Sequence, residues 1–298
     1  MWFSLSLLAL LMLTVRRSTE KKVAGNISNI ALTWLPQAIA LPVIIGTLLL
    51  SRFYWPSELS VQFWGLMAVY VILGALDLYC YFKAISVADI SYVTPLLTLF
   101  VVGNLIGAYL ILGQVPSTTG IAGALLIMAG AYVITLAKQK EKQNVQRNTL
   151  ALLLVLVVVV VRSFDANIEV LMLRESNPIS FNFYVTILTV PFVLAITALI
   201  IRQRPVQYER YWAKLATDTR TYMWPLVIIG ITYTINMLAT YQAKLVSPNA
   251  AYVAAIKSAA LLPIILIGIF FFKEKVGRLQ WFGIFLIGLG LAALATNA

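Results

Sequence analysis

The chain has 298 residues, of which 61% are apolar and only 11% charged, so it has too little polar surface to cover a soluble domain. It contains no His and one Cys, Cys80, and it lacks a GxxxxGK[ST] phosphate loop, which argues against disulfides, metal sites and nucleotide-driven work. We therefore expect an integral membrane protein that is not an enzyme, needs no cofactor or metal ion, and draws on gradients for any work.

Ten apolar segments are long enough to cross a hydrocarbon core, which needs about 20 helical residues per crossing. In chain order they cover residues 2–23, 30–51, 62–86, 90–112, 117–137, 149–173, 178–201, 222–246, 249–272 and 279–296. The longest polar stretch, 202–220, follows the seventh segment and is typical of a basic amphipathic helix on the membrane surface. The predicted fold class is all-α integral membrane, with ten transmembrane helices.

The positive charges predict the orientation of these helices. Apart from Arg162 and Lys257, which lie inside predicted helices, 17 Lys and Arg fall on one face of the bilayer and three, Arg52, Arg174 and Lys244, on the other. The crowded face is cytoplasmic by the positive-inside rule, so both termini are predicted to lie outside the cytoplasm. This topology explains the net charge of +11 without a nucleic-acid partner. We expect the lipid bilayer of the cell membrane as partner, and a monomer or a homodimer.

The two halves of the chain resemble each other. Between residues 81 and 130, a shift of 160 residues gives seven identities, among them Tyr81 with Tyr241, Gly123 with Gly283 and Gly130 with Gly290. The same shift aligns Asp89 with Asn249 and Gln114 with Glu274. The polar segment 138–148 then separates a first repeat, 1–137, from a second repeat, 149–298. Because each repeat has five helices, an odd number, the two are predicted to be inverted, an arrangement that supports alternating access.

Each half ends in a pattern that resembles the EamA-like branch of the drug/metabolite transporter superfamily. The pattern is a short Asp or Asn turn, a helix, a Gly-Glu-like stop and a Gly-rich last helix. In this chain it reads Ala88-Asp89-Ile90-Ser91-Tyr92-Val93-Thr94-Pro95 with Leu112-Gly113-Gln114, and Pro248-Asn249-Ala250-Ala251-Tyr252-Val253 with Phe272-Lys273-Glu274. The resemblance implies a ten-helix secondary transporter for a small-molecule substrate, with export of amino acids or related metabolites as the leading expectation.

Lys257 is the most informative single residue, because a charge at the bilayer centre costs at least about 2.5 to 3.5 kcal/mol on insertion scales. It sits where triose-phosphate translocators, relatives in the same superfamily, place a Lys-Arg pair that holds phosphate, although here Ser258 stands in place of the Arg. One interpretation is a substrate site in which Lys257 binds an anionic group. The other is a structural ion pair of Lys257 with Asp77, Asp165 or Glu169.

Two helices carry charged stripes. Arg162, Asp165 and Glu169 are spaced by three and four residues and therefore share one helix face. Arg17 and Glu20 repeat the spacing of three in the first helix. These stripes either line the transport pathway, one for each half, or neutralise each other internally, and for Arg162 with Asp165 internal neutralisation is the favoured interpretation.

Several further polar residues are candidates for substrate or proton binding. Glu169, with Asn167 nearby, is one candidate contact, and Asp77 and Asn236 are both predicted to lie well inside the bilayer. Since burial disfavours the charged form of a carboxylate, Asp77 is a candidate proton carrier unless it pairs with Lys257. Tyr81, Tyr241 and Ser258 complete the candidate substrate-binding set. A lipid or lipid-linked precursor flippase and a non-transporting scaffold remain the alternative functions.

Overall fold

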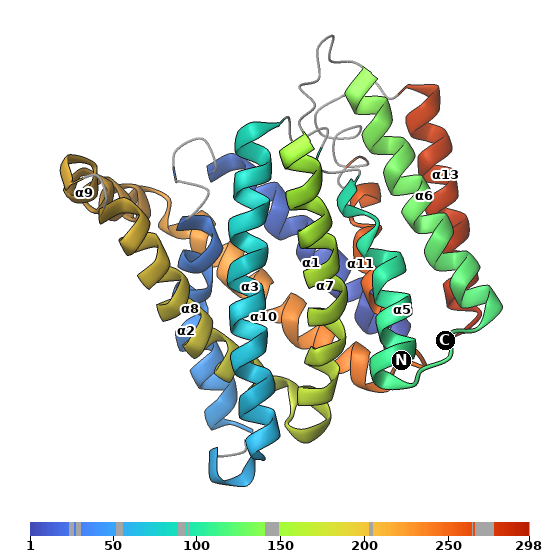
Figure 1. Cartoon of the computed structure of the whole chain (residues 1–298), viewed down its shortest axis with the longest axis horizontal. Coiled ribbons are helices and arrows are strands. Elements are labelled where there is room, and N and C mark those ends of the chain that lie inside the picture. The colour runs from blue at the N-terminus through green and yellow to red at the C-terminus, as the bar shows by residue number, and fades with distance from the viewer. Residues whose placement is uncertain are drawn as a thin grey trace.

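The computed structural model describes residues 1–23, 27, 31–51, 56–88, 93, 96–140, 149–202, 205–263, 265 and 277–297 (Figure 1). These residues are almost entirely helical and include no strand, which confirms the all-α expectation for the described part of the chain. Parts of the predicted helices 90–112 and 249–272, with Asp89, Tyr92 and Glu274, lie outside the described residues, as does most of the predicted linker 138–148. The count of ten transmembrane helices therefore stays a prediction.

The helices follow the apolar segments closely. The first half contains α1 (Trp2–Val23), α2 (Ala31–Leu49), the short 3-10 helix η1 (Pro56–Glu58), α3 (Val61–Val87), α5 (Phe100–Leu112) and α6 (Thr118–Lys140). The second half contains α7 (Thr149–Glu175), α8 (Pro178–Arg202), α9 (Pro205–Thr221), α10 (Met223–Val246), α11 (Ala250–Ser258) and α13 (Arg278–Ala295). Six of them, α3, α6, α7, α8, α10 and α13, are long and apolar enough to cross a membrane. Residues 205–220 of the predicted polar stretch 202–220 are helical, as predicted, and form nearly all of α9.

Local capping fixes where the central helices begin and end. Ser60 caps α3 by accepting a hydrogen bond from the Phe63 amide at 3.0 Å, and its own hydroxyl donates to Glu175 at the end of α7 at 2.9 Å. Asn249 caps α11 in the same way, accepting from the Ala251 amide at 2.9 Å. These caps satisfy amides that a helix start would otherwise leave without partners.

Helices from both halves surround the centre of the molecule. α1 packs on α10 and α11, α3 on α7, and α5 on α7 and α11, while α2 and α8 lie together at one side with α9 (Figure 1). Several of the helix contacts have a counterpart when the halves are exchanged, that is, when α1, α2 and α3 take the places of α7, α8 and α10, and α5 takes the place of α11. The contact of α1 with α10 then corresponds to that of α7 with α3, the contact of α1 with α11 to that of α7 with α5, and the contact of α2 with α10 to that of α8 with α3.

The last helix of each half forms the opposite edge, where α6 and α13 lie side by side (Figure 1). A Cβ added at Gly130 would lie 2.6 Å from the Gly283 carbonyl oxygen, and one added at Gly290 would lie 2.6 Å from the Gly123 carbonyl oxygen. Only glycine therefore permits the two backbones to approach this closely. The two contacts are equivalent in the repeat, because the 160-residue shift aligns Gly123 with Gly283 and Gly130 with Gly290 and so converts one contact into the other.

Candidate substrate site

The charged stripe of α7 is joined to α3 by a two-point ion pair. The Arg162 guanidinium donates from Nε to Asp77 Oδ1 at 2.8 Å and from Nη2 to Asp77 Oδ2 at 3.1 Å. The guanidinium also lies over the ring of Tyr81, 5.7 Å from its centroid. Arg162 is thus neutralised internally, but by Asp77 and not by Asp165. The alternatives that pair Asp77 with Lys257, or leave Asp77 as a free proton carrier, are wrong for this conformation.

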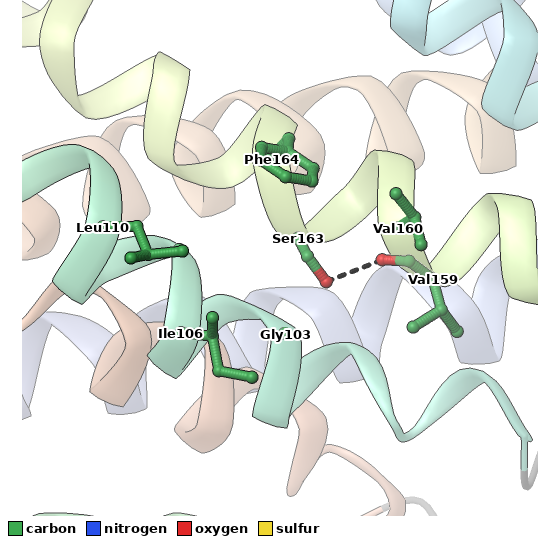
Figure 2. Close-up of a pocket in the computed structure, with 8 residues that line it drawn as sticks. Gly103, Ile106, Leu110, Val159, Val160, Ser163 and Phe164 are labelled. Atoms are coloured by element: carbon green, nitrogen blue, oxygen red, sulfur yellow. Dashed lines mark hydrogen bonds between the residues drawn. The ribbon is translucent and has the colours of Figure 1, made fainter.

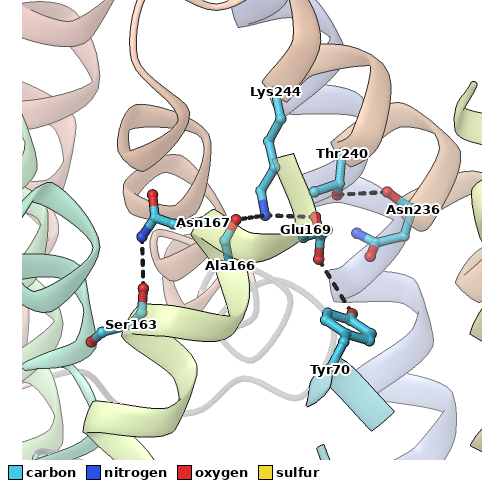
Figure 3. Close-up of polar contacts among 8 residues, drawn as sticks. All are labelled: Tyr70, Ser163, Ala166, Asn167, Glu169, Asn236, Thr240 and Lys244. Atoms are coloured by element: carbon cyan, nitrogen blue, oxygen red, sulfur yellow. Dashed lines mark hydrogen bonds and ion pairs between the residues drawn. The ribbon is translucent and has the colours of Figure 1, made fainter. Parts of the chain in front are cut away.

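A second ion pair lies further along α7 and reaches α10 (Figure 3). Lys244 Nζ donates to Glu169 Oε1 at 2.6 Å and to the Ala166 carbonyl oxygen at 3.1 Å. The Tyr70 hydroxyl of α3 donates to the other carboxylate oxygen of Glu169 at 3.4 Å. The side chains of Lys244 and Glu169 are only 6% and 11% exposed, so both charges are almost completely removed from solvent.

The ion-pair partner of Glu169 was not predicted, because Lys244 counts among the three charges assigned to the outer face, an assignment that stays a prediction. Lys244 lies in the last turn of α10 and points into the protein. A sequence signal was available, because Glu169 needed a cation and Lys244 falls within the apolar segment 222–246.

Three of the other candidates hold the helices together. Asn167 donates to the Ser163 carbonyl oxygen at 2.6 Å and lies against Gly107, whose Cβ position its amide occupies. Asn236 is fully buried and donates from Nδ2 to the Ala9 carbonyl oxygen of α1. Tyr241 packs edge-on against Phe181, with ring centroids 5.0 Å apart. These contacts give Asn167, Asn236 and Tyr241 structural partners.

The stripe on α1 faces the same centre. Arg16 donates to Glu20 at 2.7 Å and lies over the Tyr233 ring of α10, 4.8 Å from its centroid. Arg17 interacts electrostatically with Tyr81 and with Arg162 of α7. Charged groups from both halves of the chain therefore act on one another across the centre of the helix array.

Three charged residues of this region have no ion-pair partner in the part of the chain that the structure describes: Arg17, Asp165 and Lys257. Lys257 lies in the last turn of α11, and the charges acting on it are Lys244, Glu169, Arg16 and Arg17. Its neighbour Ser258 is occupied by a hydrogen bond to the Ala255 carbonyl oxygen at 2.7 Å. Asp165 Oδ1 is buried without a hydrogen-bond donor among the described residues.

We refer to these charged residues as the central cluster: Arg16, Arg17, Glu20, Asp77, Arg162, Asp165, Glu169, Lys244 and Lys257. It contains five cationic and four acidic side chains. Three ion pairs use three of each, so two cations, Arg17 and Lys257, and one acid, Asp165, remain unpaired within the described part of the chain. The excess positive charge favours binding of an anionic ligand over a cationic one. Among the described residues, no group of three or more His, Cys, Asp or Glu could hold a metal ion.

An apolar groove of about 170 Å³ lies outside the cluster, between α5 and α7 (Figure 2). Its exposed walls are Ile106, Leu110, Val160 and Phe164, and its floor is formed where Gly103 and Gly107 meet Ser163. A Cβ at Gly103 would overlap the Ser163 side chain, so the two glycines allow α5 and α7 to pack closely. The groove opens at an exposed apolar surface of α5 and α7.

Comparison with known proteins gives one family and one fold. Residues 149–296 match the EamA-like transporter family. A solved chain described only as a crystal structure of a protein aligns over 99% of this chain and 96% of its own length, with a TM-score of 0.65 and 17% sequence identity, and therefore shares the fold. No curated protein sequence matches the chain significantly.

Proposed function

Because the chain belongs to the EamA-like transporter family, and so to the drug/metabolite transporter superfamily, we propose that it carries a small anionic metabolite across the cytoplasmic membrane as a secondary transporter. Amino-acid-like carboxylates are the leading substrate class, and export is the proposed direction. The observation that carries the substrate class is Lys257, a cation on α11 with no counter-ion in the described part of the chain, within a cluster that has excess positive charge.

The route of transport follows from the repeat. We infer two inverted five-helix repeats, 1–137 and 149–298, that rock against each other around the central cluster and expose it to one side at a time. The matched helix contacts and the exchangeable glycine pairs of α6 and α13 support this arrangement. The family match begins at residue 149, the predicted first residue of the second repeat. With the 17 to 3 division of Lys and Arg, the termini are proposed to lie outside the cytoplasm.

The binding test uses purified protein and a thermal-shift screen against amino acids, dicarboxylates and phosphorylated metabolites. A ligand at about 100 times its dissociation constant stabilises the folded state by about 2.7 kcal/mol, which such a screen detects. A carboxylate that stabilises the wild type is then tested for counterflow in proteoliposomes. If no carboxylate stabilises the protein or exchanges, and cationic compounds do, the proposed substrate class is wrong.

Lys257→Met tests the anchor, and Lys244→Met serves as its matched control. Methionine keeps much of the lysine stem and removes the charge. Lys257→Met should lose the ligand-induced shift and counterflow yet melt close to the wild type, because it strands no counter-ion. Lys244→Met should lower the melting temperature without ligand, because it leaves Glu169 buried and unpaired. Full retention of ligand binding by Lys257→Met would remove Lys257 as the anchor.

A lipid-carrying function is the second candidate, and the groove between α5 and α7 is the observation that favours it. The groove is lined by apolar side chains at a level where α7 crosses the membrane, so it suits one acyl or prenyl chain. Transfer of a fluorescent phospholipid between leaflets of proteoliposomes distinguishes the two functions. Ile106→Trp would fill the groove and should block that transfer while leaving carboxylate counterflow intact.

A scaffold without transport activity requires that the buried charges stabilise each other. Three pairs do so, but Arg17, Asp165 and Lys257 have no ion-pair partner among the described residues. Holding unpaired charges in a membrane protein is costly and has no structural benefit. Lys257, a cation on α11 that is unpaired among these residues, therefore favours transport over a scaffold.

A further inference from the structure

Asp165 differs from every other acid of the central cluster. Glu20, Asp77 and Glu169 each accept from a cation, at 2.7, 2.8 and 2.6 Å. Asp165 makes no ion pair and no hydrogen bond among the described residues, and its Oδ1 atom is buried. No hydrogen-bond donor among the described residues therefore stabilises a negative charge at that oxygen.

The groups that act on Asp165 come from three helices. On α7 itself they are Arg162 and Glu169, from α3 Asp77 and the Tyr70 phenol, and from α10 Lys244 and the Tyr241 phenol. The other helices packed on α7 add no nearby charge, because α5 carries none and α8 carries only Arg202 at its far end. Both cations in this set are already ion-paired, Arg162 with Asp77 and Lys244 with Glu169.

A carboxylate that is buried without a donor or counter-ion takes up a proton in preference to staying charged. In the protonated form Asp165 needs no cation, and the pairs of Arg162 with Asp77 and of Lys244 with Glu169 can form undisturbed. In the deprotonated form a third carboxylate competes for the same two cations. Arg162 is the nearer competitor in sequence, since residues three apart on a helix lie on one face.

We propose that Asp165 is the proton-binding residue of the transport cycle, protonated in the conformation described here and deprotonated in the opposite one. This inference rests on the proposed transport function and adds its coupling ion. On deprotonation the O–H bond of the carboxyl group breaks, the proton passes to bulk water, and the electron pair stays on the carboxylate. The charged Asp165 then competes with Glu169 for Lys244 and with Asp77 for Arg162. The second competition loosens the contact between α7 and α3, helices of the two different halves.

The decisive test observes the proton directly by infrared spectroscopy of the purified full-length protein. The wild type should show the carbonyl stretch of a buried protonated carboxyl group at neutral pH. Asp165→Asn, which keeps the size of the side chain, should lose this band and melt close to the wild type. Glu20→Gln, a control at an acid that pairs with Arg16 and does not act on Asp165, should keep the band.

A second measurement avoids mutation altogether. Growing the wild type with isotope-labelled aspartate shifts the carbonyl band of protonated Asp and leaves that of protonated Glu in place. Of the four Asp in the chain, Asp77 is ion-paired, so a shifted band that Asp165→Asn abolishes identifies Asp165. A band that does not shift, or that survives in Asp165→Asn, would overturn the proposal.

The coupling is tested with the carboxylate that passes the thermal-shift screen. A pH gradient should drive its accumulation in wild-type proteoliposomes but not in those with Asp165→Asn, which should still exchange it. If Asp165→Asn accumulates the carboxylate as the wild type does, Asp165 is not the coupling residue even though transport is real. If the wild type exchanges no carboxylate while the Asp165 band is present, the transport function fails and the proton site stands.

Discussion

The ion pair of Lys244 with Glu169 should contribute strongly to stability, and its removal in two steps tests the arrangement of α7, α10 and α3. Both side chains are nearly inaccessible, at 6% and 11% exposure, so solvent screening is small. Breaking a buried pair by removing one partner costs about 3 to 5 kcal/mol, because the other charge stays buried alone. Lys244→Met and Glu169→Gln should each lower the free energy of unfolding by about that amount.

The double variant should recover most of the loss. With both charges gone, neither helix retains an uncompensated ion, and the new glutamine side chain on α7 can still accept from the Tyr70 hydroxyl. The assay is reversible unfolding in mixed micelles, followed by the circular dichroism of the helices. As a control, Glu20→Gln breaks the i,i+4 pair on α1, whose side chains are 19% and 24% exposed, and should cost only about 0.3 to 0.5 kcal/mol. If the double variant is as unstable as the sum of the single ones, the two residues do not pair.

Three further outcomes are expected. Gly130→Ala should weaken the packing of α6 on α13 and lower the melting temperature, because its Cβ would lie 2.6 Å from a backbone oxygen, whereas Gly288→Ala, with nothing within 4 Å, should melt as the wild type does. Asp77→Asn should lower the melting temperature by stranding Arg162, and the added change Arg162→Met should restore it, with thermal melts as the measurement. A reporter fused after Ala298 should be found outside the cytoplasm, and a cytoplasmic reporter would reverse the orientation while leaving the repeat intact.

The helices could be predicted from the sequence because crossing a bilayer is a local property. A run of about 20 apolar residues is long enough whatever its neighbours are. The described helices accordingly begin and end within a few residues of the apolar segments, as α1 and α7 show. The amphipathic stretch that forms α9 could be recognised for the same reason, since its basic and aromatic residues lie within one segment.

The pairing of the charges could not be predicted, because it depends on which helices meet. Asp77 and Arg162 are separated by 85 positions, and Glu169 and Lys244 by 75. Spacing on α7 correctly placed Arg162, Asp165 and Glu169 on one face, but it suggested that Arg162 and Asp165 neutralise each other. The approach of α3 decides otherwise, because Asp77 offers both its oxygens to the guanidinium, a geometry that an acid one turn away on the same helix does not match.

The corresponding helix contacts of the two halves are held by chemically different side chains. Asp77 on α3 ties that helix to α7, and Asn236 on α10 ties that helix to α1, and these two helix contacts correspond when the halves are exchanged. The first tie is an ion pair, which a third carboxylate such as Asp165 can disturb. The second is a hydrogen bond from an amide to the Ala9 carbonyl oxygen, and neither group titrates. Under the proposed proton binding, a charge on Asp165 can therefore disturb the contact between α3 and α7 but not the hydrogen bond between α10 and α1, so the matching helix contacts of the two halves would respond differently to pH.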